Sequence, residues 1–305
     1  MLSPIRALSC VAILLLPLAA PAADGPKKTA LLIAGLQSHG PGDHEHNAGV
    51  QLLAKALKQG APELLEVSVH LNAEWPSEEQ FAKADTVLIY SDGGGGHPAL
   101  RGNRLQQLGT LMARGCGVVC LHYAVEFPKE KGGPEFREWL GGYFEPNWSV
   151  NPHWTANFKA LPDHPVTRGV QPFSIKDEWY YHMRFTEGMK GVTPILTDLP
   201  PAETLSRPDG AHSGNPDVRA AVLERKEPQH CAWVVERPDG GRGFGFTGGH
   251  YHAGWANENQ RKLVLNGILW SAKAEVPASG VESTVTPEEM AMNLDPKAKK
   301  YAVGS

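Results

Sequence analysis

The feature that most constrains the fold is an alternation between short apolar runs and segments with helical spacing in the first half of the chain. The apolar runs are typical of buried strands and cover residues 28–37, 64–71, 84–92 and 117–124. Two segments with apolar residues at helical spacing, 47–59 and 102–115, stand between them and end at or next to a glycine. This β-α-β-β-α-β order predicts an α/β fold with a mainly parallel, doubly wound sheet.

The second half of the chain is predicted to extend this sheet after an irregular stretch. Residues 125–190 are dense in proline, glycine and aromatic residues, which predicts an insertion packed over one end of the sheet, because the stretch is too aromatic for disorder. Three more strands are predicted over 191–199, 230–238 and 242–249, the last two joined by a PDGG hairpin turn. A polar loop covers 203–218, and the last core helix is predicted over 258–273.

The two ends of the chain are predicted to lie outside the core domain, which we place at residues 23–273. Residues 1–22 carry Arg6, an apolar run too short to span a bilayer comfortably and an Ala-Pro-Ala cleavage signal, and are interpreted as a secretory signal peptide. The mature protein is then secreted or periplasmic, without membrane attachment; an uncleaved anchor is the alternative.

Residues 274–305 are predicted to form a linker and a short helix. Thr286 is the expected N-cap, with Pro287 in the first helical position and Glu289 completing a capping box. The sequence leaves open whether this helix docks on its own domain or on a neighbouring copy in a homo-oligomer.

The overall charge excludes one class of partner. The chain has 29 basic and 33 acidic residues, a formal net charge of -4 and no basic block, so nucleic acid is not an expected partner. No nucleotide cofactor is expected either, because the glycine run DGGGGH at 92–97 is not followed by the Gly-Lys-Ser/Thr of a phosphate-binding loop.

Three cysteines remain after the predicted cleavage, namely Cys116, Cys120 and Cys231. Four residues along a strand place Cys116 and Cys120 about 13 Å apart, whereas the Cα atoms of disulfide partners lie closer than roughly 7 Å. We expect buried thiols rather than disulfides, despite the oxidising compartment. Cys120 is not expected to act as a nucleophile, because apolar burial raises the pKa of a thiol.

Histidines and acidic residues follow several of the predicted strands. They are His39, Asp43, His44, Glu45 and His46 after the first strand, Asp92 and His97 after the third, His122 and Glu126 after the fourth, and His250 and His252 after the last. The carboxyl ends of parallel strands meet at one edge, where open α/β sheets bind their ligands. In an extended segment, the i,i+2 spacing of H-E-H and H-Y-H would put both imidazoles on one face.

These imidazoles predict a site for a divalent metal ion, zinc or a similar ion, because neutral imidazole is the commonest zinc ligand. The predicted ligands are His44, His46, His122, His250 and His252. Their spacing matches no tight metal signature, and the alternative is that some of them cap turns or bond backbone carbonyls.

His122, Glu178 and His250 form the predicted catalytic set. His122 follows a buried run at a sharp strand-to-helix transition, where α/β hydrolases and amidotransferases hold their nucleophile. An imidazole there can be a ligand, an acid or a base, and a satisfied core histidine is the alternative. Glu178 lies among aromatic residues in KDEWYYH, where burial would raise its pKa; a salt bridge or a backbone cap is the alternative.

Glycine and aromatic residues predict a sugar site beside these groups. Glycines after a strand let the backbone approach a ligand and expose N–H donors, although a flexible turn is the alternative. Flat rings with polar handles suit sugar faces, and most of the remaining rings are expected to form a small satellite core. The predicted substrate-binding residues are Asp92, Gly94, Gly95, His97, Trp148, Tyr180 and Trp255.

Four stretches in this order resemble the ThuA-like, trehalose-utilisation family: LLIAGLQSHGPGDHEHNAG, GCGVVCLHYAVE, HPVTRGVQPFSIKDEWYYH and GRGFGFTGGHYHAGWANENQRKLVLNGILW. The resemblance implies a three-layer α/β/α sandwich, flavodoxin-like and similar to class I glutamine amidotransferases. It also implies sugar catabolism, often linked to 3-keto-glycosides made by partner dehydrogenases, and a site at His122 and His250 with Glu178. His122 stands where amidotransferases carry their catalytic cysteine, which argues against amidotransferase chemistry.

We therefore expect an exported, metal-assisted hydrolase or lyase that acts on 3-keto or ordinary glycosides, with a small carbohydrate as its partner. A non-catalytic carbohydrate-binding or accessory protein is the alternative, and an amidohydrolase that uses Cys120 is a third interpretation.

Overall fold

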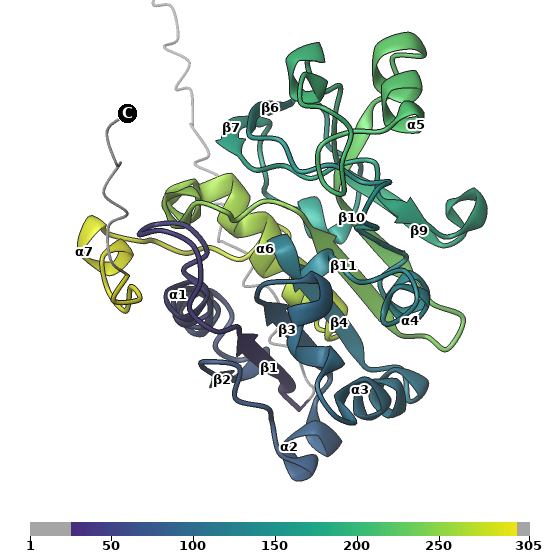
Figure 1. The fold of residues 1–305 in the computed structure, drawn as a ribbon. Helices are drawn as coiled ribbons and strands as arrows, with labels where there is room; N and C mark the ends of the chain where they lie inside the picture. Colours follow the sequence, from purple (N-terminus) through teal and green to yellow (C-terminus); the bar gives the residue numbers. More distant parts are fainter. Residues whose placement is uncertain (1–25, 298–305) are drawn as a thin grey trace, which may run out of the picture.

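The structure is a computed structural model that describes residues 26–297; the predicted signal peptide lies outside this range. Its centre is a seven-stranded sheet in the order β2-β1-β3-β4-β11-β10-β9 (Figure 1). The strands are β1 (Lys28–Ala34), β2 (Leu65–His70), β3 (Thr86–Tyr90), β4 (Gly117–Leu121), β9 (Val192–Asp198), β10 (Gln229–Glu236) and β11 (Arg242–Phe246).

The sheet is mainly parallel, as the sequence predicts. Strands β2, β1, β3, β4 and β11 pair in parallel, in the order of flavodoxin-like folds. β10 pairs antiparallel with both β11 and β9, so the hairpin predicted from PDGG is confirmed. The carboxyl ends of β1, β3, β4 and β11 therefore lie along one edge.

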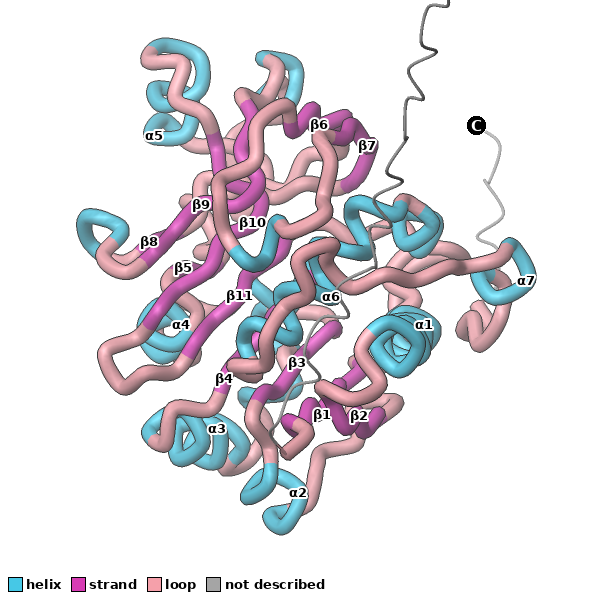
Figure 2. Tube along the Cα trace, turned by 180° about the vertical axis from the view of Figure 1, so that it is seen from behind, coloured by secondary structure: helices cyan, strands magenta, loops and turns pink. Residues whose placement is uncertain are grey.

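Helices cover both faces of the sheet and make the fold a three-layer α/β/α sandwich (Figure 2). α1 (His46–Gly60) and α6 (Glu258–Ser271) pack on one face, and α2 (Glu78–Lys83), α3 (Arg104–Ala113) and α4 (Gly133–Trp139) on the other. Because side chains alternate along a strand, Leu32 of β1 belongs to the first core and Leu31 to the second.

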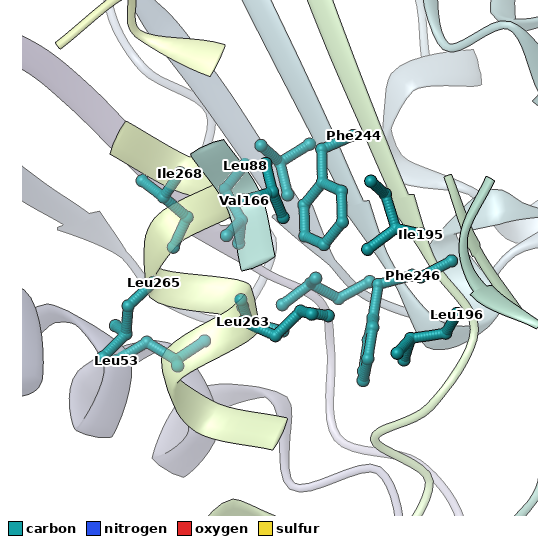
Figure 3. Packing of buried hydrophobic residues seen from close by; sticks show 14 of the residues in the cluster. Leu53, Leu88, Val166, Ile195, Leu196, Phe244, Phe246, Leu263, Leu265 and Ile268 are labelled. Atoms are coloured by element: carbon teal, nitrogen blue, oxygen red, sulfur yellow. The ribbon is translucent and has the colours of Figure 1, made fainter. Parts of the chain in front are cut away.

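The larger core lies between the sheet and the helices α1 and α6. It includes Leu263, Leu265 and Ile268 of α6 and Phe244 and Phe246 of β11, and Leu265 lies beside Leu53 of α1 (Figure 3). α6 is buried along nearly its whole length, which explains why its sequence lacks a strongly polar face.

Strand ends and short helices differ from the predictions. The strands expected over 28–37, 84–92 and 242–249 end at Ala34, Tyr90 and Phe246, because the chain turns out of the sheet there into the polar loops. α2 and α4 were not predicted; each spans fewer than two helical turns, too short for a helical period to show in the sequence.

The aromatic-rich stretch after β4 folds into α4 and two small antiparallel sheets. β5 (Gly142–Tyr143) pairs with β8 (Arg184–Phe185), and β6 (Trp154–Phe158) pairs with β7 (Phe173–Asp177). Trp154, Phe158 and Phe173 serve packing, but they join the larger core and not the small satellite core that was expected. The polar loop that follows β9 leads into the short α5 (Pro216–Arg219).

The C-terminal segment docks on its own domain. α7 (Pro287–Met290) starts as predicted, with Thr286 and Glu289 forming a capping box. Beyond it, the ammonium of Lys297 lies 3.2 Å from the Glu45 carboxylate and 3.2 Å from the His44 carbonyl oxygen. Within residues 26–297, no helix combines the length and the apolar character needed to cross a membrane.

The Glu45–Lys297 pair is buried, with side chains 1% and 2% exposed, so Lys297→Met would leave a carboxylate buried without its cation. We expect the free energy of unfolding to fall by about 3 kcal/mol, measured by urea denaturation. Lys83→Met, in an exposed pair with Glu79, is the control and should leave stability unchanged. Equal stability of the two variants would contradict the docking of the tail.

Candidate metal centre

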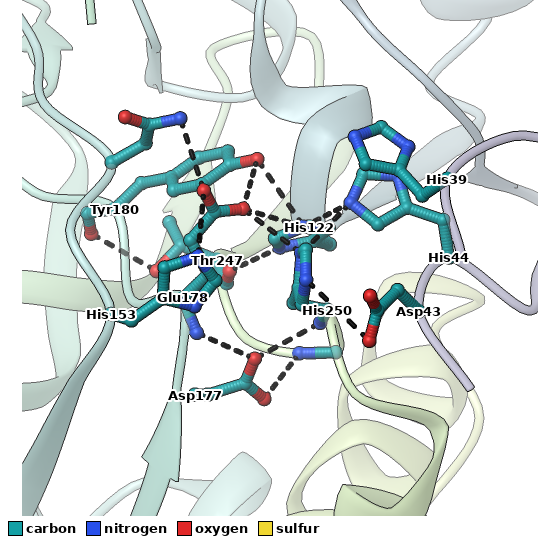
Figure 4. A network of polar contacts seen from close by, with 12 residues as sticks. His39, Asp43, His44, His122, His153, Asp177, Glu178, Tyr180, Thr247 and His250 are labelled. Carbon is teal, nitrogen blue, oxygen red and sulfur yellow. Dashed lines mark hydrogen bonds and ion pairs between the residues drawn. The ribbon is translucent and has the colours of Figure 1, made fainter. Parts of the chain in front are cut away.

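Four buried side chains converge at the carboxyl edge of the sheet. His44, His122, Glu178 and His250 each offer one ligand atom, and these atoms lie within 4.8 Å of one another (Figure 4). They come from the loops after β1, β4, β7 and β11. Two imidazoles more than 200 residues apart, those of His44 and His250, are 3.0 Å apart between Nε2 and Nδ1.

Unusual backbone conformations aim two of these rings inward. His44 has a φ of 46° and His122 a φ of 54°, in the left-handed region that costs a non-glycine residue about 1–2 kcal/mol. His122 begins a 3-10 turn directly after β4, and the His44 N–H donates to the His250 carbonyl at 2.9 Å. Such strain persists where surrounding contacts hold it, and it is concentrated at functional sites.

Outer hydrogen bonds fix which ring nitrogens face inward. His44 Nδ1 lies 2.7 Å from a carboxylate oxygen of Asp92, and His122 Nδ1 lies 2.8 Å from the carbonyl oxygen of Thr247. Both oxygens are acceptors, so both Nδ1 atoms carry the proton and donate. The Nε2 atoms are left as acceptors, which is the arrangement of metal-binding histidines with carboxylate or carbonyl partners.

The inward-facing acceptors repel one another unless a positive charge lies between them. His44 Nε2 is 3.1 Å from His122 Nε2, and both are lone-pair atoms in these tautomers. Only a proton or a metal ion removes this repulsion. Burial, followed by the charges of neighbouring imidazoles, holds the pKa of His44 well below its usual range, so His44 is in the neutral form that a metal requires.

Glu178 supplies the negative charge of the centre. Its Oε2 lies 3.0 Å from His250 Nδ1 and 3.4 Å from His122 Nε2, while Asn151 donates to Oε1 at 3.1 Å. Burial acts to raise the pKa of Glu178, but hydrogen bonds and charges from His122 and His250 outweigh it and hold the pKa well below its usual range. The opposite shift expected from burial alone is therefore wrong. In turn, Glu178 raises the pKa of His122 against the effect of burial.

Asp177 holds the loop after β11 in place and was missed by the sequence reasoning. This fully buried carboxylate accepts the N–H groups of Gly249 at 2.7 Å, His250 at 3.0 Å and Glu178 at 2.8 Å. Burial raises its pKa, opposed by the charge of His122 and by these backbone donors. The Asp-Glu pair at the end of a strand was the available signal.

The other two predicted metal ligands lie outside the cluster. His46 begins α1, with Nδ1 3.1 Å from the Leu36 carbonyl oxygen and Nε2 without a hydrogen bond. His252 begins a 3-10 turn and directs Nε2 to the Met290 carbonyl at 3.1 Å. Glu45 in H-E-H is not extended, with φ -76° and ψ 65°, whereas Tyr251 in H-Y-H is extended. In both segments the second imidazole bonds a backbone carbonyl instead of joining the cluster. Burial lowers the pKa of His46 to about 4.

Of the predicted substrate-binding residues, Tyr180 and Asp92 contact the centre, and Gly94 lies beside Glu126. The Tyr180 hydroxyl is 3.2 Å from both His122 Nε2 and Glu178 Oε2. Gly94 has a φ of 58°, and a Cβ there would lie 3.2 Å from a carboxylate oxygen of Glu126. Gly95 is exposed on the same loop.

The remaining three predicted residues have packing roles. His97 is fully buried, accepts the Ala99 N–H at 3.1 Å and packs on Phe127, and burial lowers its pKa to about 3. Trp148 stacks on His182 and lies under the guanidinium of Arg184. Trp255 is fully buried in the larger core.

Two exposed histidines at the rim were not among the predicted catalytic residues. His39 stacks on His44 with ring centroids 3.6 Å apart, and His153 Nε2 lies 3.6 Å from Glu178 Oε1. Their side chains are 41% and 44% exposed, so they border the buried cluster from the solvent side. His39 belongs to the first histidine-rich loop, but His153 follows no predicted strand.

The cysteines are free and buried, as expected. Cys120 is fully buried in β4, and burial raises its thiol pKa far above the usual value. Thiolate chemistry at Cys120 is therefore disfavoured.

Together, the fold and the cluster define a flavodoxin-like α/β/α protein with a buried histidine–carboxylate centre that can hold a metal ion. The sequence profile described as ThuA, trehalose utilisation, matches residues 33–271, so the chain belongs to the ThuA family. No curated protein matches the chain.

Two solved structures share the fold. A ThuA-like protein from Bacteroides uniformis has 19% sequence identity and a TM-score of 0.58, covering 83% of this chain and 94% of its own. A ThuA-like protein from Parabacteroides merdae has 17% identity and a TM-score of 0.51, covering 86% of this chain and 94% of its own.

We expect the chelator-stripped protein to bind one Zn²⁺ ion, because the centre joins three imidazoles to one carboxylate. His44→Gln should weaken binding by at least about 100-fold, more than the loss of an outer hydrogen-bond partner. Titration calorimetry measures both affinities. His230→Gln, a partly buried histidine on β10, is the control and should bind as the wild type does. Equal affinities in all three proteins would contradict this centre.

Proposed function

We propose that the protein is an exported, metal-assisted enzyme of carbohydrate catabolism that cleaves glycosides, 3-keto-glycosides in particular, by elimination or hydrolysis. The observation that carries the proposal is the buried centre of His44, His122, Glu178 and His250 at the binding edge of the sheet. Its setting in the ThuA, trehalose-utilisation family favours a sugar as the substrate. Export rests on the N-terminal sequence alone.

A divalent ion in this centre would polarise the keto oxygen of a bound sugar and acidify the adjacent C–H bond. The protein's own groups would then handle the protons. An imidazole at the rim, His39 or His153, is placed to accept the proton from C2, since both are accessible and border the cluster. The C–H electron pair would form a C1–C2 double bond while the C1–O bond breaks and the leaving oxygen takes a proton.

Tyr180 and Glu178 have a different task in this scheme. The Tyr180 hydroxyl, 3.2 Å from Glu178 Oε2, can donate to it and restrict its rotation. Both are buried, so water has little access to the Glu178 carboxylate. A dry site strengthens every charge interaction within it.

The placement of the aromatic residues favours an enzyme over a sugar-binding protein. A binder is expected to present its large flat rings at the site, but Trp148 and Trp255 pack elsewhere. The rings beside the cluster are tyrosines, among them Tyr123, Tyr180 and Tyr251. Binding alone also gives no reason to bury two imidazoles, His44 and His122, with their lone pairs facing each other.

Turnover of 3-keto and ordinary disaccharides tests the proposal. We expect cleavage of the keto sugar to be lost with a chelator and restored by Zn²⁺. Glu178→Gln should lower kcat/KM by at least about 100-fold, because the amide cannot balance the charge of the centre. Glu187→Gln, an exposed glutamate, is the control. Calorimetric sugar binding without turnover would favour the binder, and turnover indifferent to the chelator would exclude a metal-assisted reaction.

A further inference from the structure

A second carboxylate–imidazole pair lies close to the centre and has no part in the scheme above. Glu126, at the end of the 3-10 turn that His122 begins, is 3% exposed. Both of its carboxylate oxygens face His212 Nε2, at 3.0 and 3.1 Å. His212 belongs to the polar loop after β9, more than 80 residues away in the sequence.

His212 is held in place from several sides. Its carbonyl oxygen accepts the Asn151 N–H at 3.0 Å and an Arg207 guanidinium N–H at 3.1 Å. The ring stacks on Phe144 with centroids 5.4 Å apart. The backbone and the ring are both fixed, so the contact with Glu126 is a built position rather than a chance contact on a loose loop.

The pair and the metal centre share neighbours. Asn151, which bonds the His212 backbone, also donates its side-chain N–H to Glu178 at 3.1 Å. Phe144, which stacks on His212, packs against Tyr180 at 5.3 Å, and the Tyr180 hydroxyl contacts His122. Single residues therefore link the pair to the centre.

The exposure of the pair is asymmetric, which suits proton donation. The Glu126 carboxylate is buried, whereas the His212 side chain is 37% exposed. Nε2 is engaged by Glu126, and Nδ1 has no protein partner among the described residues. A proton on Nδ1 can therefore pass to a bound molecule while the Nε2–H bond to Glu126 is kept.

The groups around His212 favour its protonated form. Its hydrogen bond to Glu126 raises its pKa against the effect of burial; the charges of Glu126 and Glu178 add to the rise, and that of Arg207 opposes it. Burial raises the pKa of Glu126, and the hydrogen bond and charge of His212 act to lower it.

We propose that His212, positioned by Glu126, is the general acid that protonates the leaving oxygen of the glycoside. This inference rests on the proposed function. The Nδ1 proton moves to the leaving oxygen as the C1–O bond breaks and its electron pair stays on that oxygen. His212 becomes neutral and recovers a proton from water. The released product is an alcohol, the second sugar of a disaccharide.

A comparison of leaving groups tests this role. A 3-keto disaccharide has a poor leaving group that needs a proton, whereas a 4-nitrophenyl 3-keto-glucoside leaves without one. We expect His212→Gln to lower kcat/KM for the disaccharide by about 100-fold. The kcat/KM for the nitrophenyl substrate should change little. Glu126→Gln should show the same selectivity and move the alkaline limb of the disaccharide pH profile to lower pH. His230→Gln is the control, and unchanged Zn²⁺ content reports an intact fold.

The outcomes separate the two proposals. If the wild type turns over both substrates and His212→Gln lowers kcat/KM equally for both, the acid role alone is overturned. The Glu126–His212 contact would then serve only to hold the loop after β9 in place. Absence of wild-type turnover on every glycoside would overturn the proposed function and the acid role with it. NMR titration of the His212 ring gives an independent readout: we expect a pKa above the ordinary value that falls in Glu126→Gln, and an ordinary value in both proteins would also overturn the role.

Discussion

The geometry of the centre depends on the buried carboxylate of Asp177. β7 belongs to a small sheet of its own, and Asp177 at its end accepts backbone N–H groups from Gly249 and His250 in the loop after β11. A buried carboxylate without such donors would be costly, so the loop and the strand end stabilise each other. Glu178 and His250 are neighbours of these contacts in the chain, and the same bonds fix the distance between them.

The sequence predicts the scaffold well because the scaffold follows from local patterns. Apolar runs of strand length and helical spacing survive in any single sequence, and they gave the parallel sheet and the edge at which His44, His122 and His250 meet. The i,i+2 spacing wrongly predicted that His46 and His252 share a face with His44 and His250, because the prediction assumed an extended backbone. The left-handed turn at His44 breaks that assumption for His46, and left-handed residues other than glycine leave little signal in a sequence. His252 instead starts a 3-10 turn and bonds the Met290 carbonyl.

The parts of the site that the sequence did not indicate come from the irregular stretches. Asp177, His153 and His212 reach the centre through contacts between segments with no common period, such as Glu126 with His212. Tertiary packing alone decides those contacts. Two aromatic residues that the sequence did indicate are used elsewhere. Trp148 and Trp255 have suitable chemistry for a sugar, but Trp148 stacks on His182 and Trp255 packs in the core.

His97 shows within the same chain what a structural histidine looks like. It is fully buried, one ring nitrogen accepts a backbone N–H, and its ring packs against Phe127. Nothing about it calls for an ion. His44 is almost as buried, yet its Nε2 faces the acceptor Nε2 of His122 at 3.1 Å and lies 3.0 Å from His250 Nδ1, beside a carboxylate. A fold gains no stability from such a contact by itself, because acceptors facing each other repel. The arrangement is stable when a proton or a metal ion lies between the nitrogens, and this contrast with His97, rather than the number of histidines, is what supports a metal site.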